Sequence, residues 1–97
     1  MAYKVDGDTL TVHGDLIGVI DMEFDVFASE LLQAEAEVLT IDLMGVMMTG
    51  STHIGILSAF AQKVHEQGRR LRVVATGNVA KQLKESGLDQ LLELAVY

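Results

Sequence analysis

The chain has 97 residues, of which 49% are hydrophobic and 22% charged, a balance typical of a single folded domain over residues 1–97. Seven Lys and Arg against 14 Asp and Glu give a net charge of −7, which argues against nucleic-acid binding, because that binding depends on neutralising phosphates. Cysteine is absent, which excludes disulfides, and the sequence carries neither a secretory signal nor an apolar run of about 20 residues, so it predicts a cytoplasmic protein without a membrane span.

The charge is unevenly distributed along the chain. Residues 1–42 hold ten acids and one base, a net of −9, whereas residues 43–97 hold four acids and six bases, a net of +2. Two interpretations remain open. The acidic half is either ordinary solvated surface or a docking face for a basic protein partner, because complementary potentials steer association.

The first part of the chain predicts a β-hairpin followed by a helix. Two short, partly alternating segments, residues 3–5 and 9–13, flank a turn at Gly7, a pattern typical of a hairpin. Apolar residues then recur at spacings of three and four, which predicts a helix over residues 21–35. Acids crowd its first turns, where the helix dipole favours them.

The rest of the chain alternates strands with helices. Glycine at positions 68 and 87 is expected to end two of the helices, and Asn78 is expected to cap the start of one. The predicted elements are a buried strand over 38–43, a helix over 51–67, a strand over 71–75, a helix over 78–86, a further helical turn within 88–92 and a last strand over 94–97. This order predicts an α/β fold: a mixed sheet with an opening hairpin, later strands in parallel, and helices packed on it.

The segment from Asp42 to Gly55 differs from the rest, because it joins a buried strand to a helix and places three hydroxyls, Thr49, Ser51 and Thr52, around the helix start. Ser51 stands where an N-cap is expected, so its hydroxyl has two interpretations. It either caps the free backbone amides of the first turn or is exposed and suited to phosphorylation, with the phosphate on the helix N-terminus.

Three segments together resemble the STAS domain family over nearly the whole chain, in order and spacing. They are Gly14-Asp15-Leu16, then Asp42-Leu43-Met44-Gly45-Val46 followed by a serine-containing turn and Ile54-Gly55-Ile56-Leu57, and finally Ser86-Gly87-Leu88-Asp89-Gln90-Leu91-Leu92. The resemblance implies a STAS-like fold, also called SpoIIAA-like. The best-known members are anti-sigma factor antagonists.

What the resemblance implies about function is a phosphorylation switch. Such antagonists bind an anti-sigma factor, often a serine kinase, and release the sigma factor; phosphorylation ends the binding, and a serine phosphatase restores it. The phosphorylated serine falls on Ser51, with Thr52 and Thr49 as lesser candidates. The alternative is a STAS scaffold that is not phosphorylated, in a signalling assembly or a transporter ATPase complex.

The chain departs from the family pattern at three places expected to face the kinase. Gly50 replaces the acid that precedes the phosphorylated serine, His53 replaces the glycine two residues after it, and Ile17 replaces an acid of the first loop. Met47 and Met48 follow the strand and could form an adaptable apolar contact surface. The predicted partner-binding residues are therefore Met47, Met48, Thr49, Gly50, Ser51, Thr52 and His53.

No cofactor, metal site or enzyme activity is predicted. The three histidines lack zinc-ligand spacing, and phosphate-loop motifs are absent. A triad of Ser51, His53 and Asp42 is conceivable, but the surrounding residues do not form a nucleophile elbow, and Asp42 is expected to fix the turn after its strand. Four bases near the end of the second helix are expected mainly to complement its dipole: Lys63, Arg69, Arg70 and Arg72.

Overall fold

The computed structural model describes residues 2–13, 22–46 and 50–97, which form an α/β fold of five strands, three α-helices and one 3-10 helix. The predicted order of elements is confirmed. In chain order they are β1 (Ala2–Asp6), β2 (Thr9–His13), α1 (Met22–Leu31), β3 (Val38–Gly45), α2 (Ser51–Glu66), β4 (Arg70–Ala75), α3 (Gly77–Glu85), η1 (Leu88–Gln90) and β5 (Glu93–Val96).

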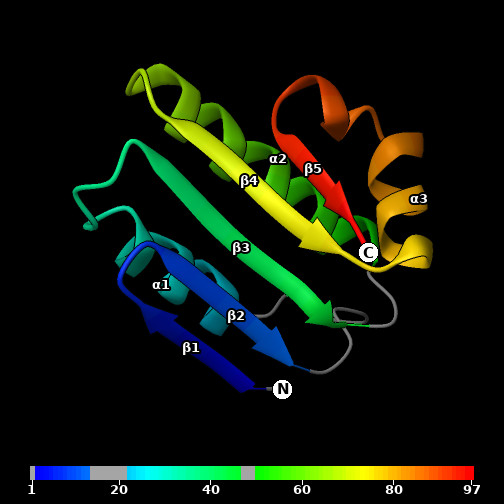
Figure 1. The fold of residues 1–97 in the computed structure, drawn as a ribbon, viewed down its shortest axis with the longest axis horizontal. Coiled ribbons are helices and arrows are strands. Elements are labelled where there is room, and N and C mark those ends of the chain that lie inside the picture. The colour runs from blue at the N-terminus through cyan, green and yellow to red at the C-terminus, as the bar shows by residue number, and fades with distance from the viewer. Residues whose placement is uncertain (1, 14–21, 47–49) are drawn as a thin grey trace.

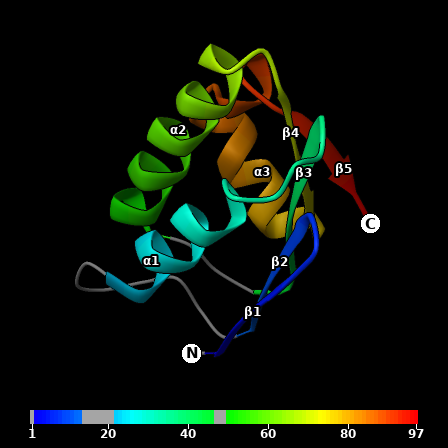
Figure 2. The same cartoon turned by 90° about the vertical axis from the view of Figure 1, so that its left-hand side faces the viewer.

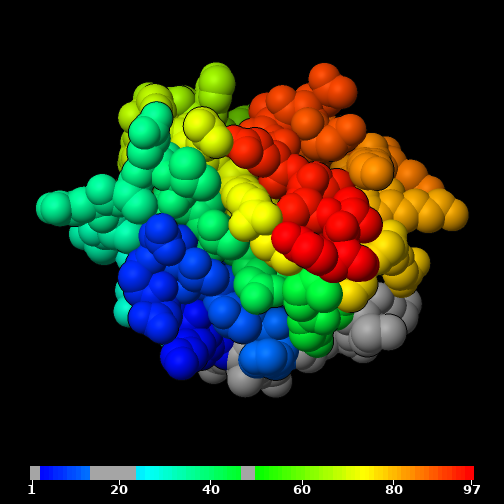
Figure 3. All heavy atoms as spheres, viewed as in Figure 1, coloured from blue at the N-terminus to red at the C-terminus, as the bar shows by residue number. Residues whose placement is uncertain are grey.

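The sheet is mixed, and its strands follow one another in chain order from β1 to β5. β1 pairs with β2 antiparallel, and all later pairs are parallel, as predicted. Right-handed crossovers that always advance in the same direction place every connecting helix on the same face. Figure 1 shows the sheet in front of the helices, and Figure 2 shows all three helices on one side of it. Figure 3 shows the opposite face of the sheet, where the strands themselves form the surface.

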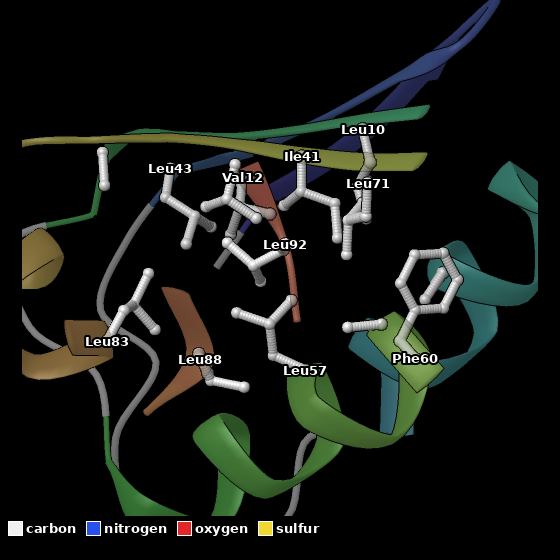
Figure 4. Packing of buried hydrophobic residues seen from close by; sticks show 14 of the residues in the cluster. Leu10, Val12, Ile41, Leu43, Leu57, Phe60, Leu71, Leu83, Leu88 and Leu92 are labelled. Carbon is white, nitrogen blue, oxygen red and sulfur yellow. The ribbon is translucent and has the colours of Figure 1, made fainter. Parts of the chain in front are cut away.

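The core lies between the sheet and the helices because alternate strand residues point toward the helices. In β3, Leu39, Ile41 and Leu43 are buried, whereas the residues between them are half-buried. Figure 4 shows the meeting of the two layers: strand residues Leu10, Val12, Ile41, Leu43 and Leu71 face Leu57 and Phe60 of α2, Leu83 of α3, and Leu88 and Leu92 near η1. Ten helical residues in α1 and 16 in α2 thus gain stability mainly from tertiary packing.

Gly45 at the end of β3 is required by the close approach of β2. A Cβ at this position would lie 2.5 Å from Nδ1 of His13 and 3.1 Å from the carbonyl oxygen of Val12. The register between β2 and β3 shifts at this same end, between Thr11 and His13. The lack of a side chain at Gly45 therefore lets β2 and β3 stay in contact at the end of β3.

The helix α1 is shorter than the predicted range of 21–35, because it ends at Leu31. The chain beyond it is held by Arg69, whose guanidinium donates to the carbonyl oxygens of Leu32 at 3.2 Å, Ala34 at 2.5 Å and Ala36 at 2.9 Å. Backbone carbonyls that would accept helical hydrogen bonds if α1 continued instead accept from Arg69, the residue directly before β4. The cap predicted at Asn78 is also wrong, because α3 begins at Gly77 with Thr76 as its N-cap.

Within residues 2–13, 22–46 and 50–97, no helix combines the length and apolarity needed to cross a bilayer.

Candidate functional site

The predicted site lies at the start of α2. Gly50 is the N-cap, with extended backbone angles of φ −102° and ψ 168°, and its carbonyl accepts the first helical bond from the amide of Ile54 at 3.1 Å. The prediction that Ser51 is the N-cap is therefore wrong by one position. Ser51 is the first helical residue, and it is exposed. A glycine cap has no side chain to accept from the first-turn amides, so this helix end lacks a side-chain cap.

The other predicted site residues are divided between described and undescribed parts of the chain. Thr52 is half-buried beside Ser51, and Gly50 is half-buried before it. Met47, Met48 and Thr49, together with Ile17 of the first loop, lie outside the described residues. Of the three hydroxyls proposed for phosphorylation, Ser51 is thus the one that the described structure exposes.

His53 lies inside the protein and not on the surface, which corrects its assignment as a partner-contacting side chain. It is 2% exposed, and its ring stands edge-on to Phe24 of α1, with centroids 6.1 Å apart. Neither ring nitrogen has a hydrogen-bond partner among the described residues. Residues that are two positions apart lie on different sides of a helix, so His53 points inward while Ser51 points outward. A buried polar group without a partner costs about 1–3 kcal/mol.

A Ser–His–Asp triad is not formed by the residues that the sequence offered for it. Neither nitrogen of His53 makes a hydrogen bond to a described residue, so it engages neither Ser51 nor Asp42. Asp42 has a structural bond instead: its carboxylate accepts from the backbone amide of Met44 at 2.9 Å. The prediction that Asp42 ends the strand and fixes the turn after it is therefore wrong, because β3 continues to Gly45 and the amide that Asp42 accepts from lies within the strand.

Sequence reasoning missed the outer face of α2. Ser51, Gly55 and Ala59 are all exposed and follow one another at spacings of four, so they lie one above another along the helix. A Cβ on Gly55 would meet nothing within 4 Å, so no neighbour in the fold requires a glycine here. Glycine in a helix interior costs about 0.5–1 kcal/mol relative to alanine. The signal in the sequence was this glycine within a predicted helix.

A groove of about 110 Å³ lies between α1 and α2. Its walls come from Asp25, Ser29 and Leu32 on one side and from Ile56, Ala59, Phe60 and Lys63 on the other. Figure 2 shows the two helices next to each other on the same side of the sheet. Four of the lining residues are apolar, namely Leu32, Ile56, Ala59 and Phe60, and each wall carries one charged residue. The groove was not anticipated from sequence, because the facing of two helices depends on the fold.

Of the four bases predicted to complement the dipole of α2, the three arginines have partners of their own. Arg69 holds the carbonyls of the segment after α1 and also donates to the side-chain oxygen of Gln67 at 3.1 Å. Arg70 pairs with Glu93 of β5, and Arg72 reaches the hydroxyl of Tyr97 at 3.4 Å. Of the four, Lys63 alone lies in the last turn of the helix, so dipole complementation is corrected to that residue.

Comparison with known proteins adds no assignment: no protein-family model matches the chain, and no curated protein matches it. The described residues also contain no group of three or more His, Asp or Glu side chains placed to hold a metal ion. The functional argument therefore depends on the site itself.

Proposed function

We propose that the chain is a STAS-type protein that acts as an anti-sigma factor antagonist. It binds an anti-sigma factor with serine kinase activity in the cytoplasm, and phosphorylation of Ser51 by that kinase ends the complex until a serine phosphatase removes the phosphate. The observation that carries the proposal is the exposed hydroxyl of Ser51 at the first position of α2. A kinase needs such access to its substrate serine.

The helix end supports a phosphate without loss of the fold. Gly50 offers the first amides of α2 no side-chain cap, and the partial positive charge of the helix N-terminus favours an anion. A phosphate there adds roughly −1.5 to −2 charge units. The isolated protein would therefore stay folded after modification, and the effect would fall on the complex.

The complex would respond strongly because the phosphate would lie inside an interface. Leaving a charge buried without a partner costs about 3–5 kcal/mol, as when one member of a buried ion pair is removed. At 1.4 kcal/mol per tenfold change, this corresponds to a loss of about 100-fold to several thousandfold in affinity. One modification is therefore sufficient to separate the partners.

The overall architecture is compatible with this proposal. The proposed family assignment requires an opening hairpin, parallel strands that alternate with helices, and a serine at the start of the helix after the buried strand. The order and pairing of the elements and the position of Ser51 at the start of α2, next after β3, support it. The proposed contact surface includes Gly50, Ser51 and Thr52, together with Met47, Met48 and Thr49. The buried ring of His53 packs against Phe24 and so helps to hold the start of α2 against α1.

The test is phosphorylation by the serine kinases of the source organism, with ATP and mass spectrometry of the product. Wild type is expected to carry one phosphate on Ser51, and Ser51→Ala is expected to carry none. Thr52→Val serves as the matched control, because it removes the neighbouring hydroxyl and should leave the modification intact. An unmodified wild-type chain, or a phosphate that persists in Ser51→Ala, contradicts the assignment.

A phosphorylation-independent scaffold is the second candidate, and Gly50 favours it. Gly50, the residue before Ser51, has no carboxylate, and it is the N-cap of α2. A scaffold would co-purify with a large signalling or transporter assembly in unmodified form, and Ser51→Asp would leave that association unchanged.

A further inference from the structure

The groove between α1 and α2 continues the surface on which Ser51 lies. Ile56, Ala59 and Lys63 line the groove, and their spacing of three and four places them in one row along α2. Thr52 precedes Ile56 by four residues and therefore begins the same row, directly beside Ser51. At about 1.5 Å per residue, Ser51 and Ala59 are roughly 12 Å apart along the helix, within the span of one bound helix.

Gly55 lies between these two points on the exposed side of α2. Open space surrounds the position that its Cβ would take, so the fold itself does not use the glycine. A glycine allows another backbone to approach a helix closely. A partner that contacts both Ser51 and the groove must pass over this residue.

The charges around the groove indicate the chemistry of what it receives. α1 contains no Lys, Arg or His, and its exposed side chains include Asp25 and Glu30. Its Val26 is 62% exposed, an apolar side chain on the same outer surface of the helix. A basic segment would find complementary charge on the α1 side of the groove, where Asp25 lies, and would have to keep its own charges away from Lys63 on the α2 side. The volume of about 110 Å³ suits one apolar side chain and is below the roughly 300–1,000 Å³ of small-molecule pockets.

We propose that this groove receives a basic amphipathic helix of the partner that covers Ser51. An apolar side chain of that helix enters between Leu32 and Ile56, and its Lys or Arg side chains lie on the α1 side of the groove against Asp25. Apolar anchors at regular helical spacing are the usual way in which a helix binds a groove. The inference rests on the proposed function, because it names the part of the anti-sigma factor that binds.

The test places a photo-crosslinking amino acid at Ala59 of the full chain in the source cells and identifies the attached peptide by mass spectrometry. Ser51 receives the crosslinker in a parallel chain, and exposed Lys81 of α3 is the control position. The expected adduct at Ala59 is a basic amphipathic helix of a serine kinase, absent from the Lys81 chain. The same type of helix from a protein without kinase activity supports the groove and contradicts the proposed function.

Other results overturn the groove assignment. A kinase adduct at Ser51 with none at Ala59 leaves the proposed function in place and removes the groove from the interface. An adduct with a second copy of this chain, with an acidic segment, or at neither position also contradicts the inference.

Affinity measurements with the captured helix, made as a synthetic peptide, give a second test. Asp25→Lys is expected to weaken binding about tenfold, because it reverses the charge beside the groove. Asp89→Lys changes the net charge equally at an exposed position in η1, away from the groove. Equal affinities for these two variants would overturn the role given to α1.

Discussion

The two ends of α2 are built differently. At its C-terminal end, Gly68 adopts φ +70° and its amide donates to the carbonyl of His65, while the amide of Arg69 donates to that of Val64. This is the usual closure of a helix by glycine. The Arg69 side chain then holds three further carbonyls. At the N-terminal end, Gly50 provides no side-chain cap, Ser51 is exposed, and His53 is buried without a hydrogen-bond partner among the described residues.

The difference separates stability from function. At the C-terminal end the backbone amides have partners, and Arg69 links the segment after α1 to the start of β4. Such an arrangement is expected where selection acts on folding. The N-terminal end leaves stabilising options unused, and residues that weaken a fold without compensation are expected at functional sites. Changes at the first end should therefore lower stability, and changes at the second should raise it.

The largest expected effect is the loss of the Arg69 guanidinium. Arg69→Ala is expected to lower the free energy of unfolding by about 2–3 kcal/mol, because bonds to a charged donor contribute about 1.5–3 kcal/mol each and this group is part-buried. Urea denaturation measures the change. Arg69→Lys should restore only part of it, because one ammonium cannot reproduce the planar geometry of the guanidinium. Full stability in the alanine variant would contradict the role assigned to this end.

The second effect has the opposite sign. His53→Leu is expected to raise the free energy of unfolding by about 1 kcal/mol, because it removes a buried polar group without a partner and keeps a similar volume. Exposed His65 provides the control, since His65→Leu removes no buried polar group and should leave stability nearly unchanged. A marked loss of stability in His53→Leu would show that the ring has a partner.

A smaller gain is expected at Gly55. Alanine there should stabilise the protein by about 0.5–1 kcal/mol, because its Cβ enters open space in an exposed helix interior. The partner should bind this variant more weakly than wild type, since its backbone would approach less closely. Thermal denaturation measures the gain in stability, and a binding titration measures the loss of affinity. Unchanged affinity would indicate that nothing packs closely on Gly55.

The smallest effect is expected from the ion pair between Arg70 and Glu93, which lies exposed on the surface of the sheet. The hydrogen bond from Arg70 lowers the pKa of Glu93, so the contribution of this pair is present above the unfolded-state pKa and is lost as the pH falls through the lower folded-state value. Exposed pairs contribute little. Glu93→Gln should therefore remove a slight, salt-sensitive pH dependence in denaturation curves. A large change would mean that the pair is not solvent-screened.

Sequence patterns predicted the elements because periodicity reports local burial. The mostly apolar, β-branched run of β3 and the three-and-four spacing in α2 both reflect burial against the core, and the strand and helix were found within one or two residues of their ends. Gly68 was predicted to end α2 because glycine adopts positive φ at little cost, and the structure gives it that conformation.

The failures came from contacts between distant segments. The end of α1 depends on Arg69, which follows Ala34 by 35 residues, and no local pattern contains that bond. The burial of His53 depends on Phe24 of another helix. Ser51 and Gly50 are both acceptable caps, so composition could not decide between adjacent positions. Family resemblance suggested the site, whereas the exposure of Ser51 required the structure.

The most direct test of the central claim is the affinity of the kinase partner for two forms of the chain, unmodified and phosphorylated on Ser51, measured by titration calorimetry. We predict that phosphorylation weakens binding at least about 100-fold, the lower bound set by an unpaired charge in an interface. Circular dichroism should show the same fold for both forms. Equal affinities would contradict the claim that Ser51 lies in the interface and switches it.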